Sequence, residues 1–193
     1  MNLYAMVNND AVNGGDYLGM LVKATYNIKA QTFEATSDKG KPLKCGKDEC
    51  SCGNNQEDAT DKDPGPLPRG MYKIYQRIKK GDKGYGEGGK LGNAWILDFQ
   101  DTPPGNDIVD KTHRFSFRIH LWVLDDKEGM KGSHGCIVLN KRCHKAFDKM
   151  VAETTKGDEK ASIVSPLTWD KNHKVTSTET FDEVPLLGTL KVE

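Results

Sequence analysis

The sequence lacks an excess of charge of either sign, because its 193 residues carry 28 basic and 28 acidic side chains. Nucleic-acid binding normally needs a basic field, so this balance argues against nucleic acid as a partner. The chain also has no apolar run near the roughly 20 residues that span a membrane. With 36% hydrophobic and 29% charged residues, its composition is typical of a globular protein that can build a core.

The N-terminus lacks the features of a secretory signal peptide. Its first ten residues contain no positive segment and no long apolar core. Unless the chain is a trimmed piece, the protein is expected to stay in the cytosol or to leave it by another route. Residues 1–20 have no clear period and predict a loosely structured lead-in. We expect residues 21–193 to form one domain, with a cysteine-containing loop at 41–63.

Short segments of β-branched and aromatic residues dominate the rest of the chain, and internal repeats are absent. Residues 71–78 alternate well between apolar and polar side chains, which is typical of a strand. Residues 165–180 are polar and predict a connection. Further strands are expected near 21–35, 94–99, 114–120, 137–139, 161–164 and 185–192. The pattern predicts a mainly β domain.

One helix is expected after Asn140, whose side chain can cap it. Apolar residues then follow at i, i+4, i+7 and i+8, and Gly157 is a good stop. Cys143 lies on this apolar face and is expected to be a core residue without a chemical role. The apolar positions are Cys143, Phe147, Met150 and Val151.

Three of the five cysteines, Cys45, Cys50 and Cys52, are clustered in the polar loop. A disulfide within the loop is one interpretation, favoured in an oxidising compartment. A zinc site that also uses a histidine such as His173 is a second, although the spacing is not the usual repeated pair. Cysteines without a special role are the third. An odd cysteine count leaves at least one free thiol if the others pair.

No nucleotide cofactor is expected from the glycine-rich run at 80–92. A phosphate-binding loop needs Ser or Thr after Gly-Lys, whereas Gly89 and Lys90 are followed by Leu91. A dinucleotide loop should open a helix, but residues 94–99 predict a strand. The run is interpreted as a hairpin loop.

The strongest chemical signal joins His120, at the end of one apolar strand, to Cys136, at the start of another. A thiol must lose its proton to act as a nucleophile, and a nearby imidazole can take that proton and later return it to a leaving amine. Gly135 removes bulk beside the sulfur, so a carbonyl carbon can approach. The backbone N–H groups at 134–136 are candidate donors to an oxyanion.

A buried cysteine on an apolar strand is often only a small hydrophobic residue. The residues before Cys136 argue against that interpretation here. Ser133, His134 and Gly135 are poor core material at a strand entrance, and His120 ends the preceding apolar strand. The combination favours catalysis.

These residues resemble the motifs of the L,D-transpeptidase catalytic domain. Phe117-Arg-Ile-His120 followed by Gly132-Ser-His-Gly-Cys-Ile137 is similar to its catalytic segment. Gly65-Pro-Leu-Pro-Arg-Gly-Met-Tyr-Lys-Ile74 is similar to its proline-containing strand entry. The sequence is most similar to the branch of this family that is used as type VI secretion effectors. The resemblance is good over residues 65–140 and weak over residues 26–40. It implies a mainly β, L,D-transpeptidase-like β-sandwich with one or two short helices.

The resemblance implies a cysteine enzyme that acts on peptidoglycan tetrapeptide stems without a metal or other cofactor. Cys136 would be the nucleophile, His120 the general base, and the backbone carbonyl of Leu121 the third member of the group. Ser133, His134 and Gly135 would shape the pocket, with the oxyanion bound by the N–H groups of His134, Gly135 and Cys136. Trp122, Arg118 and Tyr72 are expected to contact the substrate.

Two positions depart from the family pattern. The family often has Gly or Ser after the base histidine, where this chain has Leu121 and Trp122. It commonly has Arg or Asn two residues after the cysteine, where this chain has Val138. Both changes alter the wall of the expected pocket.

The expected reaction is attack on the carbonyl between the third stem residue and the terminal D-amino acid. Hydrolysis, exchange with a D-amino acid or cross-linking to a second stem would follow. With no signal peptide, we expect an antibacterial effector made in the cytoplasm and acting in the periplasm of a target cell, with a secretion-apparatus component and an immunity protein as partners. The alternatives are a resident envelope L,D-transpeptidase, a catalytically inactive peptidoglycan-binding module and a metal-binding protein.

Overall fold

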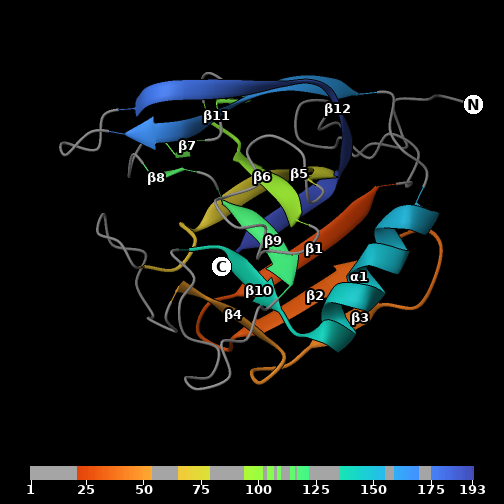
Figure 1. The fold of residues 1–193 in the computed structure, drawn as a ribbon. Coiled ribbons are helices and arrows are strands. Elements are labelled where there is room, and N and C mark those ends of the chain that lie inside the picture. Colours follow the sequence, from red (N-terminus) through yellow and green to blue (C-terminus); the bar gives the residue numbers. More distant parts are fainter. Residues whose placement is uncertain are drawn as a thin grey trace, which may run out of the picture.

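The computed structural model describes residues 21–53, 65–78, 94–101, 104–106, 108–109, 114–115, 117–121, 135–154, 159–169 and 175–193. These residues form a mainly β fold with a single α-helix, as the sequence predicted (Figure 1). The lead-in expected at 1–20 lies outside the described residues. The elements in chain order are β1 (Val22–Asn27), β2 (Thr32–Thr36), β3 (Leu43–Cys45), β4 (Cys50–Cys52), β5 (Gly70–Ile78), β6 (Ala94–Phe99), β7 (Ile108–Val109), β8 (Arg114–Phe115), β9 (Arg118–Leu121), β10 (Ile137–Leu139), α1 (Lys141–Glu153), β11 (Lys160–Trp169) and β12 (Val175–Val192).

Ten strands belong to one sheet, in the order β3-β2-β1-β12-β5-β6-β9-β10-β4, with β11 paired to β12; β7 and β8 pair separately. The two end strands, β3 and β4, are consecutive in the chain. The turn between them is closed by the N–H groups of Glu49 and Cys50, which donate to the Gly46 carbonyl at 2.9 and 3.2 Å. The sheet therefore curls in a barrel-like manner, and its inner face packs against itself.

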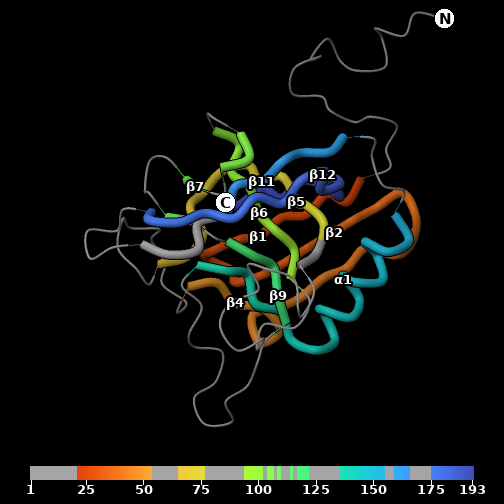
Figure 2. Tube along the Cα trace, turned by 45° about the horizontal axis from the view of Figure 1, so that its top comes forward, coloured from red at the N-terminus to blue at the C-terminus, as the bar shows by residue number. Residues whose placement is uncertain are grey.

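The main core lies on this inner face, which carries Trp95, Ile119 and Ile137. Helix α1 closes it beside β2 and β3 (Figures 1 and 2). The ring of Phe147 meets Phe33 at 5.3 Å and Trp95 at 4.8 Å between centroids, both edge to face. Edge-to-face pairs add to the stabilisation from buried apolar area. The helix is thus fixed to strands at both sides of the core.

The predicted helix boundary is confirmed at its start. The Oδ1 atom of Asn140 accepts from the N–H of Cys143 at 2.9 Å, which satisfies one of the donors left unpaired at a helix start. The predicted stop, Gly157, lies outside the described residues. The helix ends at Glu153, and the N–H of Thr154 donates to the Met150 carbonyl at 3.0 Å.

The outer face of the same sheet carries Ile96, Arg118 and His120, which alternate with the core residues along β6 and β9. The β11–β12 hairpin lies over part of this face (Figures 1 and 2). A second apolar cluster fills the space beneath it, formed by Tyr75, Ile96, Ile163 and Leu186. The hairpin therefore makes the wall on one side of the outer face.

The polar connection expected at 165–180 is wrong over most of its length. Residues 160–169 and 175–192 form two long antiparallel strands. In β12, the Thr, Ser and acidic side chains at 176–183 are mostly exposed, so this part of the sequence has no apolar alternation. Among the described residues, no helix is long and apolar enough to cross a membrane.

Candidate active site

The two residues with the strongest chemical signal lie on adjacent strands. Strands β9 and β10 are parallel, with Ile119 opposite Ile137 and His120 opposite Val138. Cys136 comes two residues before Val138, so strand alternation places it on the outer face with Val138 and His120. The Cys136 thiol is half-buried and takes part in no disulfide. Parallel pairing thus brings His120 and Cys136 to one face of the sheet.

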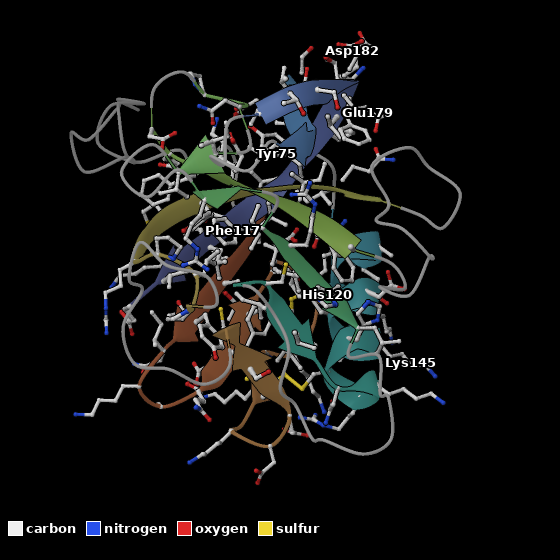
Figure 3. All side chains as sticks on the ribbon, turned by 60° about the vertical axis from the view of Figure 1, so that its left-hand side comes forward. Tyr75, Phe117, His120, Lys145, Glu179 and Asp182 are labelled. Atoms are coloured by element: carbon white, nitrogen blue, oxygen red, sulfur yellow. A yellow bond between two sulfur atoms is a disulfide. The ribbon has the colours of Figure 1, made fainter. Side chains whose placement is uncertain are left out.

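His120, labelled in Figure 3, lies on β9, and its imidazole is buried. Its Nδ1 atom lies 2.9 Å from the carbonyl oxygen of Leu121. A carbonyl oxygen can only accept, so Nδ1 carries the hydrogen and Nε2 of the neutral ring keeps a lone pair. Burial is the main cause that lowers the pKa of His120 from its usual 6.5, and the Arg118 charge lowers it further, against the opposing effect of the Leu121 contact. The structure therefore favours a neutral ring that can accept a proton at Nε2.

Arg118 lies two residues before His120 on the same face and is only 5% exposed. Its Nη1 donates to the Phe117 carbonyl at 2.7 Å, and its Nη2 donates to the Ser165 hydroxyl at 2.8 Å. The contact to Ser165 connects β9 to β11, in the hairpin that covers part of the outer face. Arg118, expected to contact the substrate, thus donates to protein groups, and its charge is one cause that lowers the pKa of His120.

Gly135 has a backbone conformation that fits glycine, with a φ of +113°. A Cβ atom at this position would collide with the Arg114 guanidinium and, at 2.6 Å, with the Phe117 ring. The guanidinium lies 5.1 Å above the centre of that ring. The residue before the candidate nucleophile is therefore enclosed on one side by packed side chains.

The proline-containing turn at 65–68 supports this region from the inner side. Arg114 donates from Nη1 to the Pro66 carbonyl and from Nη2 to the Gly65 carbonyl, both at 2.6 Å. Tyr72, expected to contact the substrate, is fully buried on the inner face, and its hydroxyl donates to Pro68 O at 2.8 Å. That position corrects the expectation, because the sheet separates Tyr72 from the face that carries His120.

Cys52 is a part of this region that the sequence did not reveal. Its buried thiol donates to the Gly135 carbonyl at 3.0 Å and accepts from the Leu67 N–H at 3.0 Å. Only the pairing of β4 with β10, which sets Cys52 opposite Ile137, brings it there. In the sequence, Cys52 stood out only as one of the clustered cysteines of the expected loop, and nothing there linked it to Gly135. Of the other predicted site residues, Ser133, His134 and Trp122 lie outside the described residues.

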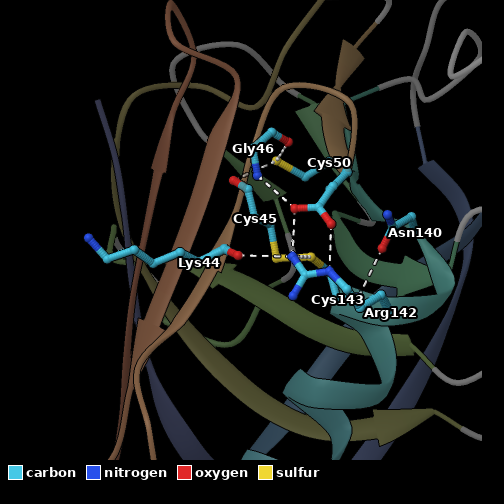
Figure 4. Close-up of polar contacts among 8 residues, drawn as sticks. Lys44, Cys45, Gly46, Cys50, Asn140, Arg142 and Cys143 are labelled. Carbon is cyan, nitrogen blue, oxygen red and sulfur yellow. Dashed lines mark hydrogen bonds and ion pairs between the residues drawn. A yellow bond between two sulfur atoms is a disulfide. The ribbon is translucent and has the colours of Figure 1, made fainter.

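The remaining cysteines exclude one of the three interpretations of the loop cysteines, a disulfide within the loop. Cys45 on β3 is bonded to Cys143 on α1, with Cα atoms 6.2 Å apart and 98 residues between them (Figure 4). Cys143 is in the core, as predicted, but it is chemically linked and not a simple apolar residue. Cys50 and Cys52 are buried thiols. Within the described ranges no three His, Cys, Asp or Glu side chains gather as a metal site, and His173 lies outside them.

Beside the disulfide, Arg142 ties the β3–β4 turn to the start of α1 (Figure 4). Its Nε and Nη2 each donate to a Glu49 carboxylate oxygen at 2.5 Å, and Nη2 also donates to the Lys44 carbonyl at 3.0 Å. The Asn140 N–H donates to the Glu49 carbonyl at 2.8 Å. The turn that closes the sheet is therefore fixed at the end of β10, where α1 begins.

Comparison with known proteins identifies a family for this chain. The family model described as the Tlde1 domain matches residues 45–163. No curated protein matches the chain. Among solved structures, the helical cell shape determining protein Pgp2 from Campylobacter jejuni is 20% identical, with a TM-score of 0.46, and the match covers 70% of this chain and 45% of that one.

An L,D-transpeptidase from Mycobacterium smegmatis is 15% identical, with a TM-score of 0.40 and coverage of 89% and 58%. One from Mycobacterium tuberculosis H37Rv is 13% identical, with a TM-score of 0.45 and coverage of 90% and 57%. The chain thus spans about half the length of these structures.

Proposed function

Since the chain belongs to the Tlde1 domain family, the L,D-transpeptidase effector family of type VI secretion, we propose that it is a cysteine acyl transferase acting on peptidoglycan tetrapeptide stems. The observation that carries the proposal is the placement of His120 and Cys136. Alternation from the pairing of β9 with β10 puts Cys136, the residue before β10, on the face that carries His120, and the His120 ring is oriented by the Leu121 carbonyl. That arrangement supplies a base and a nucleophile without any further group.

In the proposed reaction, His120 Nε2 takes the proton of the Cys136 thiol. The sulfur attacks the carbonyl carbon between the third stem residue, a diamino acid, and the terminal D-amino acid. The C–N bond breaks, the imidazolium returns its proton to the leaving amine, and a thioester remains on Cys136. Water, a free D-amino acid or the side-chain amine of another stem then attacks the thioester and restores the thiol.

In the proposed reaction, the N–H groups of Gly135 and Cys136 bind the oxyanion of the two tetrahedral intermediates. Each such donor contributes typically about 3–4 kcal/mol of transition-state stabilisation. Gly135 has no side chain, so the space beside the sulfur stays open to the carbonyl carbon. The third proposed donor, the N–H of His134, lies outside the described residues.

The proposal includes action in the periplasm of a target bacterium as a delivered effector. The disulfide between Cys45 and Cys143 supports it, because such bonds persist in oxidising compartments and are rare in the cytosol. An effector of this kind requires an immunity protein in the producer. Expression in a Gram-negative host tests this part, since periplasmic targeting should stop growth, Cys136→Ala should abolish the effect, and cytoplasmic expression should be harmless.

The experiment for the activity is incubation with purified disaccharide-tetrapeptide, with mass spectrometry of both substrate and protein. Loss of the terminal D-alanine or formation of a dimer is expected, together with an acyl adduct on Cys136. Cys136→Ala and His120→Ala should abolish product. Cys50→Ala is the matched control, because that thiol is buried away from the outer face, within hydrogen-bond distance of the carbonyls of Gln31, Cys45 and Gly46. Folded protein that yields neither product nor adduct would favour a binding module.

A further inference from the structure

The thiol of Cys52 is placed where it can set the orientation of one peptide group in the candidate site. It is 2% exposed and lies on the inner face, in the main core. It donates to the carbonyl of Gly135, the residue that precedes Cys136, at 3.0 Å. The contact therefore joins the core directly to the peptide group between Gly135 and Cys136.

This contact has a geometric consequence on the other side of the same peptide. In a trans peptide the C=O of one residue and the N–H of the next point in opposite directions. A Gly135 carbonyl directed at Cys52 on the inner side therefore directs the N–H of Cys136 away from the core. His120 and Val138 lie on that outer side, opposite each other across β9 and β10.

Two further contacts limit rotation of this peptide. The Cys52 sulfur accepts from the Leu67 N–H at 3.0 Å, so its own position is fixed by the turn at 65–68. Arg114 is held by the Gly65 and Pro66 carbonyls of the same turn and lies against Gly135 together with Phe117. The proline-containing turn is thus connected to the candidate nucleophile through two side chains.

We propose that Cys52 is a positioning residue that turns the Gly135–Cys136 peptide so that the Cys136 N–H faces the oxyanion. The inference rests on the proposed acyl-transfer function and deepens it. It also gives the turn at 65–68 a role in catalysis, because this turn fixes both Cys52 and Arg114. Cys52 touches no reacting atom, so its effect passes entirely through the orientation of one donor.

The chemical state of Cys52 suits this role. Burial raises the pKa of its thiol to about 12, partly offset by the Leu67 N–H. The thiol is therefore protonated at neutral pH and remains a donor to the Gly135 carbonyl throughout the working range. A thiolate at this position would repel the carbonyl oxygen and release the peptide.

Cys50 is a matched control on the same strand. It is also buried, and burial likewise raises the pKa of its thiol to about 12. Its sulfur points to the carbonyls of Gln31, Cys45 and Gly46, which lie at the other end of β4 from Gly135. Substitution of Cys50 thus removes a buried thiol from β4 without removing the contact to the Gly135–Cys136 peptide.

The first test measures NMR frequencies of the Gly135–Cys136 peptide group and does not depend on enzyme activity. Gly is followed by Cys only once in the sequence, at Gly135–Cys136. Labelling with 1-¹³C-glycine and ¹⁵N-cysteine therefore gives a single cross-peak in an HNCO spectrum. We expect Cys52→Val to shift the carbonyl and amide frequencies of that peak, Cys52→Ser to retain them more closely, and Cys50→Val to leave them unchanged. An unchanged peak in folded Cys52→Val overturns the proposal.

The second test separates positioning from general damage. Cys52→Val should lower kcat about tenfold or more, with KM within about twofold, because only transition-state binding is lost. Cys52→Ser should recover most of kcat, and Cys50→Val should keep it. The rate of Cys136 alkylation by iodoacetamide should stay unchanged, since this reaction needs the thiolate but no oxyanion donor. If Cys52→Val does not fold, Cys52→Ala takes its place.

The two proposals fail in different ways. If the wild-type protein forms no product, the acyl-transfer proposal fails, while the labelled peak still decides whether Cys52 sets the peptide orientation. If the wild-type protein is active and folded Cys52→Val keeps its kcat, or if Cys50→Val loses as much, positioning by Cys52 is wrong and the acyl-transfer proposal stands.

Discussion

The Nδ1 atom of His120 donates to the carbonyl oxygen of Leu121, its neighbour in the chain, at 2.9 Å. This contact orients the ring with a neutral acceptor instead of a carboxylate. A carboxylate beside His120 would favour the protonated ring, whereas a carbonyl oxygen gives a weaker effect that does not offset burial here. The base of the proposed reaction is therefore kept neutral by its surroundings.

We expect the acid limb of kcat/KM to lie below pH 6.5, the usual pKa of histidine. Because the pKa of His120 is lowered in the folded protein, the ring stays neutral and can act as a base as pH falls through 6.5. It becomes protonated, and activity declines, only at lower pH. The measurement is hydrolysis of the tetrapeptide between pH 4 and pH 9. An acid limb above pH 6.5 would contradict the burial argument.

The charge of Arg118 gives this expectation a second test. It lowers the pKa of His120, so Arg118→Gln should move the acid limb toward higher pH. Arg142→Gln is the control, because that guanidinium is exposed and paired with Glu49 instead. If both variants shift the limb equally, local charge at Arg118 is not the cause. Thermal unfolding would show that both remain folded.

Local sequence signals were enough to predict the centre of the fold. Alternation in residues 71–78 and the apolar run at 94–99 predicted β5 and β6, because burial on one or both faces leaves a readable pattern. Asn140 and the spacing of Cys143 and Phe147 predicted α1 for the same reason. His120 and Cys136 were singled out as candidates because a histidine and a cysteine at the ends of apolar strands, next to Ser, His and Gly, are poor core material.

The parts that sequence reasoning missed depend on long-range pairing. Cys45 meets Cys143 only because α1 packs beside β3, and no spacing rule connects residues 98 positions apart. Cys52 reaches Gly135 through the pairing of β4 with β10. The ends of the β11–β12 hairpin, at 161–164 and 185–192, were predicted as strands, but its part between residues 165 and 180 is largely polar in sequence and had no hydrophobic signature.

We expect Gly135→Ala to destabilise the protein by about 1–3 kcal/mol, the usual cost of a strained backbone conformation. Its φ of +113° disfavours any side chain, and the new methyl group would collide with Arg114 and Phe117. Gly46→Ala is the matched control, since its Cβ would meet nothing within 4 Å. Urea unfolding of the two variants measures the difference, and equal losses would show that the enclosure of Gly135 is unimportant.

Removal of the Cys45–Cys143 disulfide should lower the free energy of unfolding by about 2–4 kcal/mol, because the bond restricts a long loop in the unfolded chain. The measurement is urea unfolding with and without a thiol reductant. The double variant Cys45→Ser/Cys143→Ser should unfold at the same midpoint in both conditions. The expectation would be contradicted if the wild-type protein unfolded at the same urea midpoint with and without the reductant, with reduction verified by mass spectrometry.

The ion pair between Glu49 and Arg142 should contribute little on its own, although its geometry is bidentate. Both side chains are partly exposed, so water screens the attraction and a coupling of about 0.5–1 kcal/mol is expected. A double-mutant cycle with Glu49→Gln and Arg142→Met measures it by urea unfolding. A coupling near zero at neutral pH would mean that the disulfide and the Asn140 contact hold the turn without this pair.

The pH dependence of the coupling follows from the carboxylate. Hydrogen bonds from Arg142 are the main cause that lowers the pKa of Glu49 below its usual 4.5. The folded protein therefore keeps the charged form to lower pH than the unfolded chain does, and the stabilisation is present above pH 4.5 and is lost as pH falls through the lowered pKa. Repeating the cycle at successively lower pH should show the coupling decline only below pH 4.5. A coupling that persists after Glu49 is protonated would mean that hydrogen bonds between the neutral carboxyl group and Arg142, and not charge, link the two residues.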